Sequence, residues 1–473
     1  MTPDRRDQAV RAAMAQGLLG PDAEPVIALV DIAGIRAGAA SLRAAFEQVT
    51  DAPVLHAFAV KAAPLVGVLR LLGSEGLGAE VASPGELALA RAAGIPASRI
   101  VLDSPAKTPG ELRTALDLGI AVNTDNAQEL DRIDAMIGAA GEGGAARAPG
   151  GSDGSGRSAG AAGGSAGAAA PPSPASTLGL RVNAQIGAGA IGALSTATAT
   201  SKFGVGLRDE GAREWIVRAF LDRPWLTRLH THSGSQGLPL ELMAAGVRTV
   251  YELAEEINAA AGRQQVDTLD IGGGLPVDFT SDEETPGFAD YTRVLEREVP
   301  GLFDGRYGLV TEFGRALTAK HGLVLARVEY AKRTGNRPIA LTHAGVQVAT
   351  RTVYAPGAWP VRIAAYDADG RPRTGPDVVQ DIAGPACFAG DLLAEARGLP
   401  LLEQGDVVAA LDTGAYYFTS HYAYNSLVRP AVYGFRAAAG GRDGDVEFSL
   451  VRDSQTMEEI VAESGGAHPD ALL

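Results

Sequence analysis

Short apolar segments alternate with amphipathic patterns through most of the first 312 residues. Strands are predicted at Val26–Asp31, Val54–Val60, Ile100–Asp103, Ile120–Asn123, Leu178–Asn183, Leu226–His232, Val266–Ile271 and Leu309–Glu312. Helical patterns, such as the one that includes Ser41–Val49, separate most of them. This alternation favours a parallel sheet, and so many units over about 280 residues favour a closed eight-stranded α/β barrel. The alternative is an open doubly wound sheet, but no G-x-G-x-x-G phosphate motif follows an early strand.

The pattern changes after about residue 320. The later segments LVLARVEYA, PIALTHA, PVRIAAY and DVVAALD are strand-length, rich in valine and separated by glycine and proline. Such segments are typical of β structure. We therefore predict that a mostly β domain follows the barrel.

Residues 139–176 consist mainly of glycine, alanine, serine and proline and contain almost no large apolar side chain. A segment of this composition cannot bury enough surface to offset the entropy lost on ordering. We predict a disordered surface insertion in the barrel, and a spacer is the simplest role for it.

Composition limits the classes of function. The chain has 473 residues, of which 46% are hydrophobic and 21% charged, as in globular proteins, and no apolar run is long enough for a membrane helix. A net charge of −15 argues against a nucleic-acid partner. The N-terminus is charged without an apolar signal core, and the single cysteine, Cys387, excludes an internal disulfide. We expect a cytoplasmic protein without membrane or nucleic-acid partners.

Lys61 follows the apolar segment HAFAV at the end of a predicted barrel strand. Catalytic groups collect at this end of barrel strands. Desolvation there would lower the pKa of a lysine and make its amine a nucleophile for an aldehyde. A lysine that merely extends its amine into solvent is the commoner case, so the prediction depends on the motifs that accompany Lys61.

Two of these motifs can hold a flat anionic ligand. In His230-Thr-His232-Ser-Gly-Ser235, an imidazole can stack on a ring while Ser235 and backbone N–H groups bind a phosphate. The spacing of the two histidines also places them on one face of a strand, as in half of a metal site. No further cluster of ligands accompanies them in the sequence, so we predict no metal. The three glycines at 272–274 expose further N–H groups to an anion.

The last predicted barrel strand ends in Glu312-Phe-Gly-Arg315. A carboxylate at this position can keep a pyridine nitrogen protonated, and an arginine can bind a phosphate or a substrate carboxylate. A plain ion pair at a strand end is the alternative.

In chain order these motifs resemble the diaminopimelate, ornithine and arginine decarboxylases, which are fold-type III pyridoxal-phosphate enzymes. The resemblance runs from about Val26 to Gly434 and includes FAVKA, EVASPGELALARAAGIPASRIVLDSPAKTPGEL, SKFG, HTHSGSQ, DIGGG, EFGR, GPACFAGD and GAYYF. It implies an N-terminal (β/α)8 alanine-racemase-like barrel at 33–318 that binds pyridoxal 5'-phosphate. It also implies a mostly β domain, formed by 1–32 and 319–473, and a homodimer with shared active sites.

The same resemblance implies roles for single residues. Lys61 carries the cofactor as a Schiff base, His232 stacks on its ring and Glu312 pairs with the pyridine nitrogen. Further cofactor contacts are implied for Arg181 near the phenolic oxygen and, at the phosphate, for Ser235, Gly273, Gly274, Arg315 and Tyr416. Cys387, presented by the second subunit, helps to protonate the product after carbon dioxide leaves.

Departures from the family pattern concern the substrate. The family usually has an acid directly after the cysteine, where this chain has Phe388. Ornithine-type enzymes carry another acid after the tyrosine that matches Tyr354, and here Ala355 follows it. A buried ammonium without a carboxylate partner is costly. We therefore expect Arg351, Tyr354 and Phe388 to bind a neutral, aromatic or conjugated amino acid rather than a simple basic diamino acid.

The predicted activity is pyridoxal-phosphate-dependent α-decarboxylation of an amino acid or an amino-acid conjugate. Racemisation on the same fold is one alternative, although the resembling racemases place an arginine against the pyridine nitrogen where this chain has Glu312. A non-catalytic, decarboxylase-like regulator is the other. The presence of Lys61, His232, Glu312 and Cys387 together argues against it.

Overall fold

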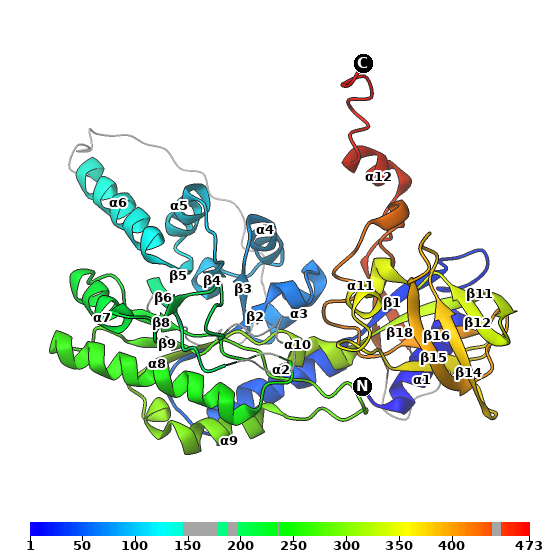
Figure 1. Ribbon diagram of the computed structural model, residues 1–473, viewed down its shortest axis with the longest axis horizontal. Helices are drawn as coiled ribbons and strands as arrows, with labels where there is room; N and C mark the ends of the chain where they lie inside the picture. Colours follow the sequence, from blue (N-terminus) through cyan, green and yellow to red (C-terminus); the bar gives the residue numbers. More distant parts are fainter. Residues whose placement is uncertain (145–177, 188–196, 235, 438–445) are drawn as a thin grey trace, which may run out of the picture.

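The computed structural model describes residues 1–144, 178–187, 197–234, 236–437 and 446–473. Two sheets organise these residues: a parallel barrel, on the left of Figure 1, and a mostly antiparallel sheet on the right. Among the described residues, no helix is long and apolar enough to cross a lipid bilayer.

Eight of the nine strands in the first sheet close a ring, and the ninth, β7 (Val205–Gly206), pairs only with β6. The ring consists of β2 (Val54–Ala59), β3 (Gly78–Val81), β4 (Ile100–Asp103), β5 (Ala121–Thr124), β6 (Leu178–Asn183), β8 (Arg228–His230), β9 (Thr268–Asp270) and β10 (Gly308–Thr311). Parallel pairing of β5 with β6 and of β2 with β10 completes it. The predicted barrel is confirmed.

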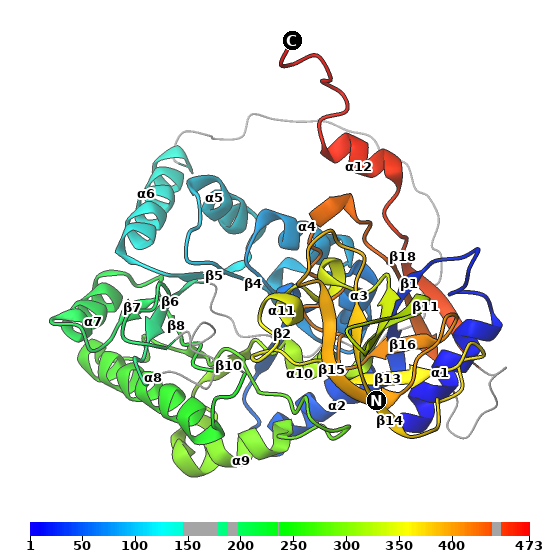
Figure 2. The same cartoon turned by 45° about the vertical axis from the view of Figure 1, so that its right-hand side comes forward.

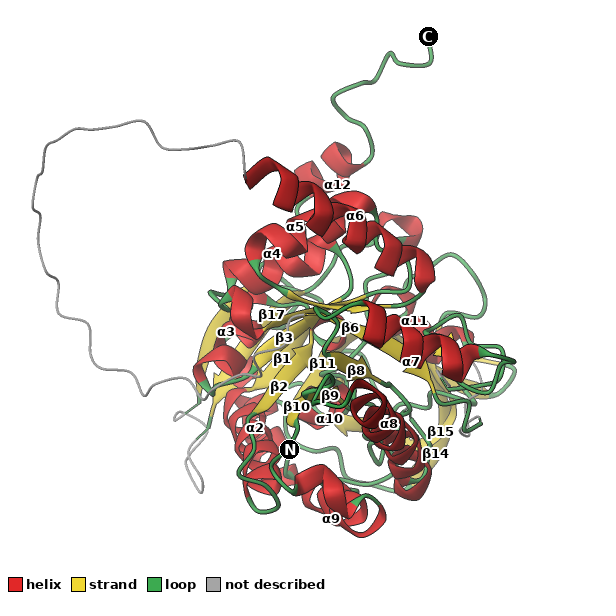
Figure 3. Ribbon diagram, turned by 90° about the vertical axis from the view of Figure 1, so that its left-hand side faces the viewer, coloured by secondary structure: helices red, strands yellow, loops and turns green. Residues whose placement is uncertain are grey.

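Helices surround the barrel strands in Figure 3. They are α2 (Ile32–Glu47), α3 (Val66–Ser74), α4 (Pro84–Ala92), α5 (Pro109–Leu118), α6 (Ala127–Gly144), α7 (Ala212–Asp222), α8 (Leu240–Ala261) and α9 (Phe288–Glu298). Their ends follow ordinary helix chemistry. Helix α5, for example, begins with a capping box between Thr108 and Glu111 and ends at Gly119, whose φ of 70° suits a glycine C-cap.

The second sheet also has nine strands. They are β1 (Val26–Asp31), β11 (Gly322–Thr334), β12 (Arg337–Thr342), β13 (Ile363–Tyr366), β14 (Asp377–Ala383), β15 (Leu392–Pro400), β16 (Val407–Ala410), β17 (Ala431–Arg436) and β18 (Glu447–Arg452). Helix α1 (Pro3–Ala15) lies against this sheet in Figures 1 and 2. The mostly β domain is thus confirmed, whereas its exact boundaries stay a prediction.

The alternation pattern places Val26–Asp31 in the parallel series, and this interpretation is wrong, whereas the family resemblance assigned residues 1–32 to the β domain. Strand β1 pairs antiparallel with β11 and parallel with β17, in the second sheet. Val26, Ala28 and Val30 face the main core, while Ile27 and Leu29 pack in a second core with α1. Because both faces are buried, β1 has the continuous apolar run that is typical of a barrel strand.

The strand that takes its place in the ring, β3, was not predicted. It has four residues, and the buried Glu80 interrupts its apolar pattern. Residues 139–144 of the predicted insertion are helical, because α6 continues to Gly144. The remainder of that prediction, residues 145–176, lies outside the described residues.

Candidate active site

A cavity of about 320 Å³ opens at the carboxyl ends of the barrel strands. Both parts of the fold contribute to its lining, which consists of Ala59, Lys61, His232, Gly234, Gln236, Gly274, Leu275, Glu312, Gly314, Arg315, Ala316, Arg351 and Tyr416. Of these, Arg351 lies on α11 (Val346–Tyr354) and Tyr416 follows β16. The structure therefore gathers most of the predicted site residues in one pocket.

Lys61 lies in a single 3-10 turn, Val60–Ala62, directly after β2. Its Nζ atom is 2.5 Å from Oε2 of Glu80, which is buried on β3, and its side chain is 41% exposed toward the cavity. The predicted lowering of its pKa is wrong for this structure. Burial alone would lower the pKa of Lys61, but the Glu80 carboxylate outweighs burial and raises it above its ordinary value.

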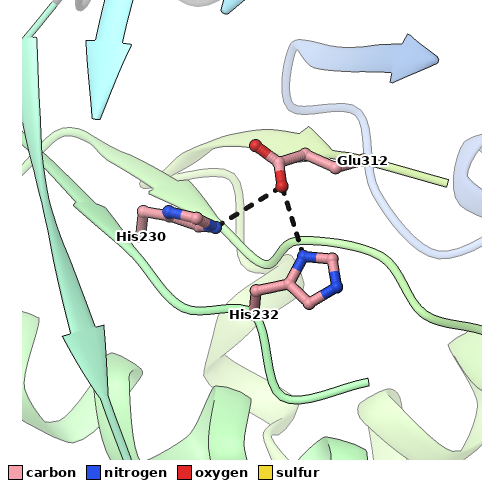
Figure 4. A group of neighbouring side chains, drawn as sticks. All are labelled: His230, His232 and Glu312. Atoms are coloured by element: carbon pink, nitrogen blue, oxygen red, sulfur yellow. Dashed lines mark hydrogen bonds and ion pairs between the residues drawn. The ribbon is translucent and has the colours of Figure 1, made fainter. Parts of the chain in front are cut away.

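Glu312 lies between two histidines, as Figure 4 shows. Its Oε2 atom is 3.4 Å from Nδ1 of His232 and 3.5 Å from Nε2 of His230. Burial would raise the pKa of Glu312, but the two imidazoles hold it well below its usual range. A carboxylate that stays ionised in a buried pocket can bind a cationic group of a ligand.

The prediction that no further metal-ligating group accompanies the two histidines is wrong, because the fold brings Glu312 beside them. Ligand atoms of His230, His232 and Glu312 lie within 4.8 Å of one another. The three residues come from β8, the loop after it and the end of β10, and β9 lies between the two strands. Sequence spacing concealed this closeness, because Glu312 comes 80 residues after His232.

The glycine motif packs backbone against backbone beside this group. A Cβ atom on Gly234 would lie 2.1 Å from the carbonyl oxygen of Gly273, and Gly274 has a φ of +89°. Only glycine fits such an approach, which leaves room for a ligand close to the main chain. Ser235, the predicted phosphate contact in the adjoining loop, lies outside the described residues.

Arg315 and Arg351 form the cationic side of the cavity. Their guanidinium carbons lie 4.8 and 4.9 Å from the centroid of the Tyr416 ring, and both also contact Trp359. Neither pairs with a carboxylate of the described residues, and Nη1 of Arg315 is buried there without a hydrogen-bond partner. Burial lowers the pKa of Arg351 to about 10, and the nearby Arg315 charge adds to this effect. The pair is suited to bind an anion.

Tyr416 is fixed in place by its backbone. Its φ is +61°, an uncommon value for a residue with a side chain. Its N–H donates to the carbonyl oxygen of Ala62 over 3.0 Å. This bond ties the tyrosine to the turn that carries Lys61.

Five predicted residues of the described part of the chain do not line this cavity: Arg181, Gly273, Tyr354, Cys387 and Phe388. Cys387 is exposed, and its backbone N–H donates to Oδ1 of Asn425 over 2.7 Å. Tyr354 and Phe388 stack on each other, with ring centroids 5.9 Å apart and planes at 7°. Arg181 also lies outside the lining, because it is buried against Asp103 over 2.7 Å.

Several charged residues at the site were not predicted. Glu80 and Asp103 are the carboxylates that contact Lys61 and Arg181, and the buried Asp270 accepts a hydrogen bond from Asn123 over 2.9 Å. The signal that could have revealed them is an acidic residue near the carboxyl end of a short, otherwise apolar strand.

A closed barrel combines here with a lysine at its strand ends, an ionised buried carboxylate and two arginines that form no ion pair with a carboxylate of the described residues. Such a site could hold an anionic carbonyl cofactor. Residues 35–147 and 166–319 match the family model described as pyridoxal-dependent decarboxylase, pyridoxal binding domain. The chain belongs to this family. It is a pyridoxal-phosphate-dependent amino-acid decarboxylase.

Individual relatives agree with this assignment. A diaminopimelate decarboxylase of Pseudomonas aeruginosa is 31% identical over 89% of each chain, and one of Aquifex aeolicus is 28% identical over 80% of each. The diaminopimelate decarboxylase of Helicobacter pylori, solved with L-lysine, has a TM-score of 0.75, with 22% identity, 94% of this chain covered and 98% of the other. A lysine/ornithine decarboxylase of Vibrio vulnificus has a TM-score of 0.68, with 19% identity and coverage of 92% and 99%. These two likenesses show the fold.

Proposed function

We propose that Lys61 binds the aldehyde of pyridoxal phosphate and that this pocket decarboxylates a neutral, aromatic or conjugated amino acid. The observation that carries the proposal is the convergence of Lys61, Glu312 and Arg315 on one cavity. Borohydride reduction of the cofactor-loaded protein, followed by peptide mass spectrometry, tests it. The label is expected on Lys61, and an unlabelled Lys61 in cofactor-saturated protein refutes the proposal.

Two polar atoms of the cavity residues fit this cofactor. Oε1 of Glu312 and Nη1 of Arg315 are both buried without a hydrogen-bond partner in the described residues. A pyridinium N–H and a phosphate oxygen are the groups that such atoms bind. In this proposal the phosphate is also bound by Gly273, Gly274 and Ser235, and Tyr416 closes over it. Arg181 would lie near the phenolic oxygen of the cofactor.

The cofactor, when bound, withdraws electrons from the bond between Cα and the carboxylate of the substrate. Glu312 keeps a proton on the pyridine nitrogen, because its own pKa is held well below its usual range. His232 would pack against the cofactor ring, and the amine of Lys61 would hold the cofactor aldehyde. Arg315 would bind the phosphate and so orient the ring.

The proton that replaces the carboxylate comes, in this proposal, from Cys387 of a second subunit. The thiol is exposed and does not line the cavity of its own chain. An ordinary thiol, with a pKa of about 8.5, is largely protonated at neutral pH and can donate to a carbanion. We therefore propose a cytoplasmic homodimer with shared sites, and the single free cysteine agrees with a reducing compartment.

The substrate proposal rests on the surroundings of Phe388. Its ring lies 5.9 Å from that of Tyr354 and 5.5 Å from that of Tyr424, and Tyr422 completes the group. The nearest acid in the same loop, Asp391, is only 3% exposed and accepts the backbone N–H groups of Val346 and Ala386.

Because Asp391 is engaged with the backbone, the aromatic group of Tyr354, Phe388, Tyr422 and Tyr424 offers no free carboxylate for a distal ammonium. This group does not line the cavity of its own chain, so in the proposed homodimer it would face the partner's cavity together with Cys387. The diaminopimelate decarboxylases among the relatives act, by their name, on a diamino acid, so the proposal sets this chain apart from them. Measuring carbon dioxide release over a panel of neutral, aromatic and basic amino acids decides the point.

A further inference from the structure

His230 has no role in the function proposed above, although it lies at the centre of the site. It is a residue of β8 and is 0% exposed. Its Nε2 atom lies 3.5 Å from Oε2 of Glu312 (Figure 4), and its Nδ1 atom lies 3.6 Å from Oδ1 of Asp103. Both ring nitrogens thus face carboxylates at ion-pair distance, and neither has a hydrogen-bond partner among the described residues. Two facing carboxylates favour a charged imidazole, which carries a proton on each nitrogen.

The charges around His230 favour the protonated ring. Three basic side chains and five carboxyl groups lie in this part of the barrel: Lys61, Arg181 and Arg228, and Glu80, Asp103, Asp267, Asp270 and Glu312. Burial raises the pKa of Glu80 to about 8 and that of Asp270 to about 7. Asp103 and Glu312 lie against the two ring nitrogens of His230, and a buried carboxylate without a compensating charge is costly. Burial opposes protonation, but Glu312, Asp103 and Asp270 raise the pKa of His230 to about 9.

We propose that His230 is an imidazolium held between Asp103 and Glu312, and that it acts as a positioning residue that keeps the Glu312 carboxylate ionised. The inference rests on the proposed contact between Glu312 and the pyridine nitrogen. While Glu312 stays ionised, the proton between the two groups remains on the pyridine nitrogen. With a neutral residue at position 230, the two groups would compete for that proton, and the pyridine would be protonated for a smaller part of the time.

A metal ion is the other arrangement that two histidines and a carboxylate suggest. Zinc bonds of about 2.0–2.2 Å would place neighbouring ligand atoms about 3.4 Å apart in a tetrahedral site. The imidazole nitrogens of His230 and His232 lie 3.5 and 3.4 Å from Oε2 of Glu312, so their spacing fits a metal as well as ion pairs. The metal content of the wild-type protein is therefore one of the deciding measurements.

The test compares His230 with a buried histidine of the same barrel that forms no ion pair with a carboxylate of the described residues. His56 lies on β2, and its Nδ1 atom lies 2.9 Å from Oγ1 of Thr311. Burial, together with the Arg43 and Arg99 charges, lowers the pKa of His56 to about 3. It therefore serves as a neutral internal reference, and His56→Asn is the matched control for His230→Asn.

Nitrogen NMR of the holoenzyme with labelled histidines reads the charge directly. At neutral pH, His230 is expected to give two protonated ring nitrogens and His56 only one, each assigned by the loss of its signals in the Asn variant. In protein loaded with pyridine-labelled cofactor, the pyridine signal should move toward the unprotonated position in His230→Asn and not in His56→Asn. The kcat of His230→Asn should fall at least about tenfold, the equivalent of one pKa unit, with KM changed less than about twofold.

The outcomes separate this inference from the proposed function. Cofactor bound at Lys61 together with a neutral His230 overturns the inference alone, and failure of the cofactor to bind Lys61 overturns the proposed function. A stoichiometric metal ion in the wild-type protein, absent from His230→Asn, also overturns the inference. If His230→Asn does not fold, the wild-type spectrum decides by itself.

Discussion

The ammonium of Lys61 and the carboxylate of Glu80 form an ion pair across adjacent barrel strands, with 2.5 Å between Nζ and Oε2. Glu80 is buried, so the pair stabilises the charged form of an amine that must be neutral to attack an aldehyde. The fold thus sets the protonation state of the proposed cofactor lysine through a residue one strand away.

Replacing Glu80 by glutamine should lower the pKa of Lys61, because burial then acts without the opposing charge. The pH at which cofactor capture reaches half of its maximal rate should move downward, and capture at neutral pH should become faster. Stopped-flow absorbance of apoprotein mixed with pyridoxal phosphate, measured from neutral to alkaline pH, checks this. Glu75→Gln, which removes a charge paired with Arg36, serves as control. An unchanged pH profile for Glu80→Gln contradicts the prediction.

Gly234→Ala should damage both stability and cofactor binding. The new Cβ would lie 2.1 Å from the carbonyl oxygen of Gly273, so one of the two loops must move. Overpacking of this kind costs about 1–3 kcal/mol, which urea unfolding measures. Gly138→Ala, at an exposed helical position with open space around it, should instead stabilise by about 0.5–1 kcal/mol. Equal stability and cofactor affinity in Gly234→Ala and wild type would be evidence against the described loop packing.

A mixture of Lys61→Ala and Cys387→Ala proteins should regain activity, because Cys387 does not line the cavity of its own chain. Random reassortment leaves one intact site in each mixed dimer, so about a quarter of wild-type activity is expected from two-fold pairing. Subunit exchange is confirmed independently with tagged chains. No recovery after demonstrated exchange means that each site is built within one chain.

Ornithine, lysine and diaminopimelate should be poor substrates of the wild-type protein. A buried ammonium without its carboxylate costs about 3–5 kcal/mol, which corresponds to at least about a hundredfold in specificity. Phe388→Glu should shift kcat/KM toward one of the three, while Phe388→Leu, which adds no charge, should not. Efficient wild-type turnover of any of them would falsify the substrate proposal.

Site residues that follow directly after one strand were predictable from the sequence. Lys61 and Arg315 follow apolar segments, and in a parallel barrel the residues after the strands gather at the carboxyl-terminal mouth. Contacts between residues of two different strands were not predictable. Glu80 lies in a strand too short to recognise, and Glu312 and His230 belong to elements that β9 separates in the sheet.

Membership of a sheet also escaped the sequence, because burial on both faces looks the same in either sheet. The alternation pattern misplaced strand β1 for this reason, and only the family resemblance assigned residues 1–32 to the β domain. The aromatic group around Phe388 was not predictable from the sequence either. It consists of Phe388, Tyr354, Tyr422 and Tyr424, and no periodic pattern connects these positions.

Strand β1 has a consequence for synthesis on the ribosome. All barrel strands lie between Val54 and Thr311, so the ring can close while the rest of the chain is still being made. The parallel partner of β1 begins only at Ala431, so a strand made near the start waits for one made near the end. Until then the edge of β1 that pairs with β17 lacks its partner, and an unpaired strand edge invites nascent-chain aggregation and chaperone capture. Docking of this strand, rather than barrel closure, is expected to be the late step in maturation.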